Sequence, residues 1–259
     1  MDENLFSRPC SGDASSSPRK TTRAASALLK LLAALGIVVI LIAFFLPAVR
    51  NGGARLAANR NMCANQLHQI ALAIRSYVDA HHALPPLYTT DADGKPLHSW
   101  RTLILPYLEE QKLYDSVDLT KPWNDPANAE ACKKSPGVYQ CPAADIGDNR
   151  TTYLAVVTPG GLLQPGEPTH LSAIPNAQKT LMLIEADLDD AVPWMAPIDA
   201  DEQIVMGIGT HSKLAHPGIM NGAFADSHVE SLGSDLPADQ RRAMLSTANQ
   251  GESTAGAGN

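Results

Sequence analysis

Acidic residues gather between positions 187 and 202, and their side chains are the first in the sequence that could do chemistry. Carboxylate oxygens at alternating positions suit Ca²⁺, which extracellular modules often bind weakly. No EF-hand register fits, because position six counted from Asp187 is Val192. A solvated acidic loop is therefore the alternative. The predicted calcium set is Asp187, Asp189, Asp199 and Asp201, and calcium is the only cofactor that the sequence suggests.

A second group, His211, His216, His228 and Asp226, suits metal binding or acid–base catalysis. The step from His211 to His216 is not the i, i+4 spacing that places two ligands on one helix face. Alternatively, His216 caps a turn before Pro217 and hydrogen-bonds a backbone carbonyl. The chain has no Gly-x-Ser-x-Gly motif and no phosphate-binding glycine loop. We therefore do not expect an enzyme, and a hydrolase using His216 and Asp226 is the only catalytic alternative kept.

Four large side chains, Trp100, Arg101, Trp123 and Trp194, form the predicted binding set. Tryptophan rings with polar tips stack on sugar rings or on partner surfaces. The same rings serve equally well as the core of a small sheet domain. Arg101 is expected to pair with a carboxylate such as that of Glu109 or Glu185.

A long apolar segment near the start of the chain must position everything that follows. Residues 31–46 carry no polar side chain, and residues 24–49 are interrupted only by Ser26 and Lys30. A bilayer core about 30 Å thick needs roughly 20 helical residues. We predict a retained transmembrane anchor over 24–49. A signal peptide cut near Gly52-Gly53-Ala54 is the alternative.

Charge is divided unevenly along the chain. Residues 1–61 carry eight Lys/Arg against three Asp/Glu, and residues 62–259 carry twelve against twenty-four. Basic residues beside a span favour a cytoplasmic N-terminus at an anionic inner leaflet. An acidic remainder argues against nucleic acid, which requires clustered Lys/Arg. We expect a single-pass protein of the inner (cytoplasmic) membrane, with the lipid bilayer as partner and its C-terminal domain outside the cytoplasm.

The rest of the chain predicts an α+β domain. Residues 1–23 read as a disordered cytoplasmic tail, 50–248 as one outer domain and 249–259 as a second disordered tail. Apolar side chains at three- and four-residue steps predict a helix to about residue 82, packed on an antiparallel sheet with long loops. Further expected elements are a short helix over 100–110, ordered loop over 121–148, strands over 152–157, 180–184, 204–208 and 223–229, and a last helix around residues 235–242.

The four cysteines limit the disulfide chemistry. Cys10 lies in the predicted tail, whereas Cys63, Cys132 and Cys141 lie in the predicted outer domain. Three cysteines allow at most one internal bridge there. Their types and spacing do not decide which two pair.

Motifs in a fixed order along the chain resemble those of the DUF1559 family of planctomycete and related bacterial proteins, which have a prepilin-like N-terminus. The resemblance covers residues 28–244 and implies a pilin-like or pseudopilin-like fold, without an established activity. The motifs are Leu46-Pro47-Ala48-Val49, Cys63-Ala64-Asn65-Gln66-Leu67, Pro85-Pro86, Ser99-Trp100-Arg101, Leu105-Pro106-Tyr107-Leu108-Glu109, Pro122-Trp123-Asn124, Tyr139-Gln140-Cys141-Pro142, Thr152-Tyr153, Thr180-Leu181-Met182-Leu183-Ile184-Glu185, Trp194, Pro197, Asp199, His216-Pro217-Gly218 and Ala223-Phe224-Ala225-Asp226.

The chain departs from the family at the membrane boundary. Members with an intact prepilin signal read Gly-Phe-Thr-Leu-Ile-Glu, where this chain reads Ala25-Ser26-Ala27-Leu28-Leu29-Lys30. The glycine before the cut has become Ala25, and the acidic residue has become Lys30. In pilins that carboxylate is thought to neutralise the N-terminal amine of a neighbouring subunit, whereas a lysine repels it. We therefore expect neither prepilin-peptidase processing nor assembly into a conventional pilus.

The resemblance also bears on the cysteines. Cys63 and Cys141 lie in its motifs and Cys132 does not, so it favours a Cys63–Cys141 bridge over a local Cys132–Cys141 bridge. Together, these observations predict a membrane-anchored pilin/pseudopilin-like envelope protein of structural or assembly role. Other pilin-like subunits or envelope components are the expected partners. The alternative is an anchored extracellular module that binds a solute or a glycan.

Overall fold

The computed structural model describes residues 20–45, 52–166, 169–170 and 176–245, without the side chains of 20–26, 41–45 and 52. The chain divides into two compact units, residues 1–52 and 53–259. The first unit contains helix α1, Lys20–Phe45. Among the side chains described, no helix is long and apolar enough to cross a membrane. The predicted anchor over 24–49 extends beyond the described side chains and remains a prediction.

Helix α2, Gly52–His81, provides the periodic helix that the sequence predicts. Its inward side chains Cys63, Leu67, Ile70 and Ile74 are almost completely buried. The helix ends where His82 adopts a left-handed φ of 60° and its N–H donates to the carbonyl of Val78 at 2.7 Å. This is the usual single-bond end of a helix.

The centre of the second unit is a five-stranded sheet in the order β7-β4-β5-β8-β9. Neighbouring strands are antiparallel except the edge pair β4 and β7, which is parallel. The chain is thus α+β with mainly antiparallel strands. The strands are β4 Tyr153–Val157, β5 Leu181–Glu185, β7 Ala200–Asp201, β8 Ile219–Phe224 and β9 Val229–Gly233, and two small sheets pair β1 Tyr88–Thr90 with β2 Pro96–Ser99, and β3 Arg150–Thr151 with β6 Val192–Pro193.

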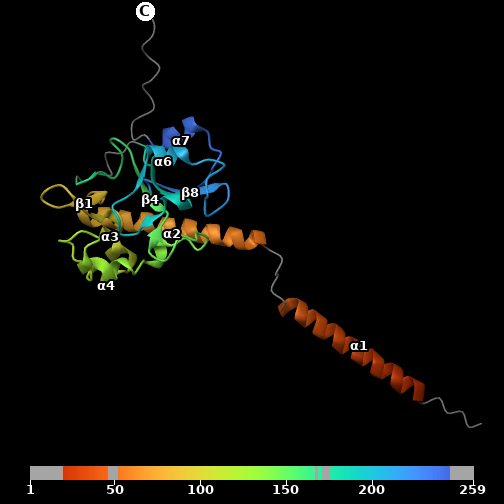
Figure 1. Cartoon of the computed structure of the whole chain (residues 1–259). Helices are drawn as coiled ribbons and strands as arrows, with labels where there is room; N and C mark the ends of the chain where they lie inside the picture. Colours follow the sequence, from red (N-terminus) through yellow and green to blue (C-terminus); the bar gives the residue numbers. More distant parts are fainter. Residues whose placement is uncertain (1–19, 46–51, 167–168, 171–175, 246–259) are drawn as a thin grey trace, which may run out of the picture. The chain divides into compact units, whose positions relative to one another are not determined.

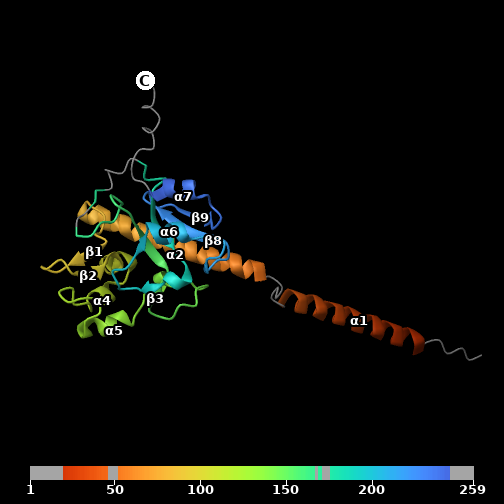
Figure 2. The ribbon, with the colours of Figure 1, turned by 45° about the horizontal axis from the view of Figure 1, so that its top comes forward.

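Side chains alternate between the two faces of this sheet, as the period of a strand requires. Tyr153 and Ala155 of β4 join a core with the inward face of α2. Leu154 and Val156 join a second core with residues of α6 Glu202–Gly207 and α7 Ala238–Leu245. The two helices α6 and α7 lie side by side in both views (Figures 1 and 2). The sheet is therefore covered on both faces.

Short helical turns connect the larger elements. Residues 121–148, expected to be ordered loop, contain no strand but several short helical turns. The helix expected over 100–110 is broken into α3 and η1. These turns are α3 Trp100–Leu103, η1 Leu105–Leu108, α4 Gln111–Tyr114, η2 Pro126–Asn128, α5 Ala129–Cys132, η3 Gly137–Tyr139 and η5 Leu188–Asp190.

Two predicted strands are wrong. Residues 204–208 lie mostly in α6, because the Asp201 side chain accepts a hydrogen bond from the Ile204 N–H at 2.9 Å and starts a helix there. Residues 223–229 contain a β-hairpin turn between β8 and β9, in which Ser227 has a left-handed φ of 76°. By contrast, the predictions over 152–157 and 180–184 correspond to β4 and β5.

Candidate functional site

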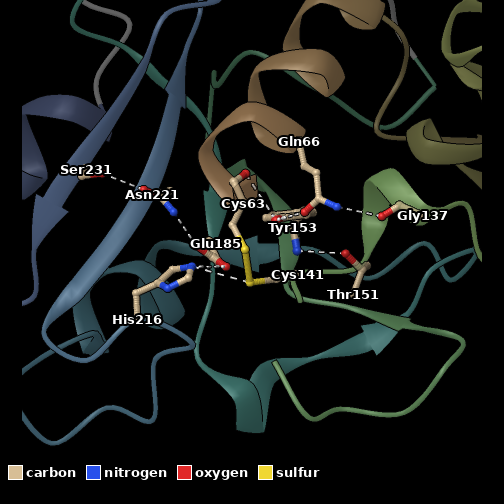
Figure 3. The surroundings of a disulfide bond; sticks show 10 residues. All are labelled: Cys63, Gln66, Gly137, Cys141, Thr151, Tyr153, Glu185, His216, Asn221 and Ser231. Atoms are coloured by element: carbon tan, nitrogen blue, oxygen red, sulfur yellow. Dashed lines mark hydrogen bonds and ion pairs between the residues drawn. A yellow bond between two sulfur atoms is a disulfide. The ribbon is translucent and has the colours of Figure 1, made fainter. Parts of the chain in front are cut away.

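A buried cluster of sulfur, imidazole and carboxylate groups joins α2 to the sheet (Figure 3). Cys63 of α2 is disulfide-bonded to Cys141, which follows η3, with the two Cα atoms 5.3 Å apart. Cys132 is a free, half-buried thiol, and Cys10 lies outside the described residues. The bond ties the helix to a loop 78 residues further along the chain.

Two titratable side chains face this disulfide. The His216 Nε2 atom lies 3.6 Å from the Cys141 Sγ atom and 3.6 Å from the Glu185 Oε1 atom. Glu185 closes strand β5, and His216 precedes β8. Their side chains are 2% and 4% exposed, so water screens this pair very little.

The other carboxylate oxygen of Glu185, Oε2, accepts a hydrogen bond from strand β8. The Asn221 Nδ2 atom of β8 donates to Glu185 Oε2 at 2.7 Å, and the Ser231 hydroxyl of β9 donates to Asn221 Oδ1 at 2.8 Å. Glu185 Oε1, in contrast, is buried without a hydrogen-bond partner. Three neighbouring strands therefore fix the carboxylate so that its unsatisfied oxygen faces the imidazole and the disulfide (Figure 3).

Burial dominates the electrostatics of the cluster. Burial raises the pKa of Glu185 to about 7, while the hydrogen bond from Asn221 acts in the opposite direction. Burial also lowers the pKa of His216, and the charge of Arg60 adds to this effect. The cluster thus disfavours charge on both groups when no counter-charge is present.

These four side chains also have the composition of a metal site. One ligand atom from each of Cys63, Cys141, Glu185 and His216 lies within 4.8 Å of the others. Across the part of the chain that the structure describes, this is the only group of three or more His, Cys, Asp or Glu side chains that could hold a metal ion. The predicted calcium aspartates do not form such a group.

Asp199, one of those four aspartates, is instead the buried partner of Arg101. Its Oδ1 atom lies 2.7 Å from Arg101 Nη2 and also accepts from the Trp100 indole N–H and the Ala155 N–H. Burial raises the pKa of Asp199, while Arg101 and the two N–H donors oppose this rise. The expected partners Glu109 and Glu185 are therefore wrong for Arg101.

The other aspartates lie at the surface around η5 and α6. Asp187 and Asp201 line an open pocket of about 390 Å³, and Asp189 pairs with Lys213 at 2.8 Å. Asp187 also accepts a hydrogen bond from the backbone N–H of Lys213. The carboxylates of Asp187 and Asp189 therefore already have partners within the protein, both on Lys213.

The binding set predicted from the tryptophans is mostly interior. Trp100, Arg101 and Trp194 are fully buried, and Trp123 is half-buried. The Trp194 indole N–H donates to the carbonyl of Cys132 at 3.0 Å, and its ring stacks on Tyr139. Trp100 and Trp194 thus act as core residues in this structure.

His216 and His228, two histidines of the predicted acid–base group, do not lie together in one site. Asp226 pairs with His228 at 2.5 Å on the exposed hairpin, whereas His216 faces Glu185 in the interior. The expected hydrogen bond from His216 to a backbone carbonyl is not among the bonds of its ring in the described residues. Sequence reasoning missed the Glu185–His216 pair. The only available signal was a glutamate closing an otherwise apolar strand.

Comparison with known proteins places this fold in a family. A family model described as a protein of unknown function, DUF1559, matches residues 53–183. The chain belongs to the DUF1559 family. No curated protein matches the chain, and no solved structure matches it.

Proposed function

We propose that the protein is a membrane-anchored, pilin-like structural or assembly protein of the bacterial envelope, non-enzymatic and not cleaved by prepilin peptidase. The single observation that carries the proposal is the surface of α1. Its large apolar side chains from Leu28 to Ile40 are between 48% and 70% exposed, on every side of the helix. A helix that is apolar all round belongs in a protein core or in a bilayer.

The disulfide supports the proposed location outside the cytoplasm. Disulfides persist in oxidising compartments such as the periplasm and are rare in reducing cytosol. The Cys63–Cys141 bond lies in the second unit. The bond therefore supports our proposal that this unit lies on the outer side of the membrane, with the N-terminus in the cytoplasm.

The buried tryptophans favour a structural role over the binding alternative. A module that stacks a sugar or solute on Trp100 or Trp194 needs those rings at the surface, and both are fully buried. Lys30, exposed on α1, stands where pilins carry the acidic side chain. This favours an uncleaved anchor that displays the DUF1559 unit, rather than a subunit of a conventional pilus.

The anchor is tested with charges placed in α1. Leu35→Lys/Val38→Lys should cost about 5–7 kcal/mol of membrane insertion, taking roughly 2.5–3.5 kcal/mol for each lysine at the centre of a span. The matched control is Leu56→Lys/Met62→Lys, at two exposed apolar positions of α2. The measurement is the fraction of chain that resists alkaline carbonate extraction from membranes.

The wild type and the control should stay in the membrane pellet, and the α1 variant should be extracted or degraded. Extraction of the wild type, or equal retention of both double variants, would contradict the anchor.

A further inference from the structure

The two cysteines of the Cys63–Cys141 bond and the two titratable side chains beside it are all of types that bind metal ions. We propose that, when both cysteines are thiols, Cys63, Cys141, His216 and Glu185 bind one Zn²⁺ ion. This inference does not depend on the proposed envelope role. It concerns the same four buried residues in a different oxidation state.

The distances already fit a tetrahedral ion. Zinc bonds of about 2.3 Å to sulfur, 2.0–2.1 Å to nitrogen and 2.0–2.2 Å to oxygen place ligand atoms roughly 3.3–3.8 Å apart. His216 Nε2 lies 3.6 Å from both Cys141 Sγ and Glu185 Oε1. Two edges of the tetrahedron are therefore present, and all four ligand atoms lie within 4.8 Å. The main movement required is separation of the two sulfur atoms.

A second observation points to a cation independently of the cysteines. Glu185 is 2% exposed, and its Oε1 atom has no hydrogen-bond partner although it faces the cluster. Buried polar atoms are rarely left in this state. A bound cation would satisfy this oxygen, which in the disulfide form has His216 Nε2 at 3.6 Å but no hydrogen bond.

The surroundings supply the outer contacts that metal ligands usually have. Asn221 holds the other oxygen of Glu185, and Ser231 holds Asn221 (Figure 3). Such contacts fix the orientation of a ligating carboxylate. Two thiolates and one carboxylate around Zn²⁺ leave one net negative charge, and Arg60 lies near enough to act on His216 electrostatically. Its positive charge opposes that excess.

The chemistry of the exchange balances without an added reductant, because the chain is synthesised with thiols. Binding of Zn²⁺ to two thiols forms two Zn–S bonds and releases two protons. Conversion to the disulfide breaks the two Zn–S bonds and the S–S bond of an incoming thiol–disulfide oxidoreductase, and forms the Cys63–Cys141 S–S bond. Two electrons pass from the thiolates to the oxidoreductase, which takes up two protons from solvent and becomes a dithiol, and Zn²⁺ leaves. The metal site and the disulfide are thus alternative states, and each fastens α2 to the sheet.

The test uses the full chain in detergent with Cys10→Ser and Cys132→Ser, so that only the two cluster cysteines remain. Each protein is unfolded and reduced with a phosphine, then refolded without oxidant in the presence of Zn²⁺ or Co²⁺. Metal content, the thiolate-to-Co²⁺ charge-transfer band and the melting temperature are measured. His216→Asn and Glu185→Gln remove ligands, and His228→Asn is the control at an exposed histidine.

The reduced protein should bind one Zn²⁺ per chain and melt at a higher temperature with the metal, and the oxidised protein should do neither. His216→Asn should weaken binding by at least about tenfold, since even loss of an outer contact costs 10–100-fold. Disulfide formation and melting of each oxidised variant show that it folds. Absence of binding to the reduced protein, or equal affinity in His216→Asn and His228→Asn, would overturn the proposal.

Discussion

At the scale of single residues, the interior of this protein is fastened by charged and polar side chains with many partners. The Arg101 guanidinium donates to Asp199, to Ser99 and to the carbonyls of Tyr153, Ala196 and Ile198. A buried charge is tolerated only with such complete pairing. Arg101 therefore links α3 to strand β4 and to the segment before β7.

His98 of β2 gives a pH-dependent prediction. Its Nε2 atom donates to the carbonyl of Lys121 at 2.7 Å, so the buried Nδ1 atom is unprotonated and has no partner. Burial lowers the pKa of His98, while the backbone groups of Lys121 and Asp118 and the charge of Asp118 oppose this. The folded state therefore binds fewer protons than the unfolded chain below the ordinary histidine pKa of about 6.5.

The contribution of His98 to the free energy of unfolding should be largest above about pH 6.5 and should fall as the pH drops towards about pH 5, by roughly 1.4 kcal/mol for each unit by which its pKa is lowered. The raised pKa of Glu185 acts in the opposite direction and is common to wild type and variant. His98→Gln, whose amide can still donate to Lys121, should show a shallower fall. His81→Gln, at an exposed histidine, is the control. Denaturant unfolding of the disulfide-bonded chain at several pH values measures the difference, and parallel curves for wild type and His98→Gln would refute it.

The sequence allowed the residues of the candidate sites to be singled out, but it did not allow their interaction partners in the fold to be predicted. The sequence already allowed a core role for the tryptophans, because large rings in a small sheet domain are usually interior. Arg101 and Asp199 are 98 positions apart, and only the folded sheet brings them together. The Glu185–His216 pair depends in the same way on how β5 and the segment before β8 are arranged.

At the scale of elements, strand β8 depends on a glycine for its close packing. A Cβ atom added at Gly222 would lie 2.7 Å from the Leu181 Cδ1 atom and 3.3 Å from the Leu232 Cδ1 atom. Both leucines belong to the core between the sheet and helices α6 and α7. Gly222 therefore lets β5, β8 and β9 share this core without a steric clash.

Gly222→Ala should destabilise the fold by about 1–3 kcal/mol, the usual cost of overfilling a packed core. Gly207→Ala, at the end of α6, is the matched control because nothing lies within 4 Å of an added Cβ atom there. The free energy of unfolding of the disulfide-bonded chain measures both. A neutral Gly222→Ala would show that this core has room to adjust.

The elements whose own sequence has a strong hydrophobic periodicity were predictable. Helix α2 and strands β4 and β5 combine a clear apolar pattern with proline, glycine or aspartate at their ends. Helix α6 was not predicted, because Ile204 and Val205 favour a strand while the cap from Asp201 favours a helix. The β8–β9 turn was missed because its left-handed residue is Ser227 rather than glycine.

At the scale of the whole molecule, the first unit contains an apolar helix, and the second unit contains the DUF1559 match and the Cys63–Cys141 disulfide. The sequence supports the anchor through length and apolarity alone. Among the described residues of the second unit, the disulfide is buried and the free thiol of Cys132 is partly covered, which suits the proposed location in an oxidising compartment. Ala25 and Lys30 stand where prepilin-like members of the family have a glycine and an acidic residue, so we expect an uncleaved N-terminus.

Intact-mass spectrometry of the native membrane fraction, with thiol labelling before and after reduction, tests the central claim most directly. We predict a chain that is not cut before Ser26 or near Arg55, with two cysteines that become reactive only after reduction. A mature chain beginning at Ser26, especially with a methylated amine, would contradict it and restore the processed pilin. A chain beginning near Arg55 would contradict it in another way, by showing a protein that is exported without an anchor.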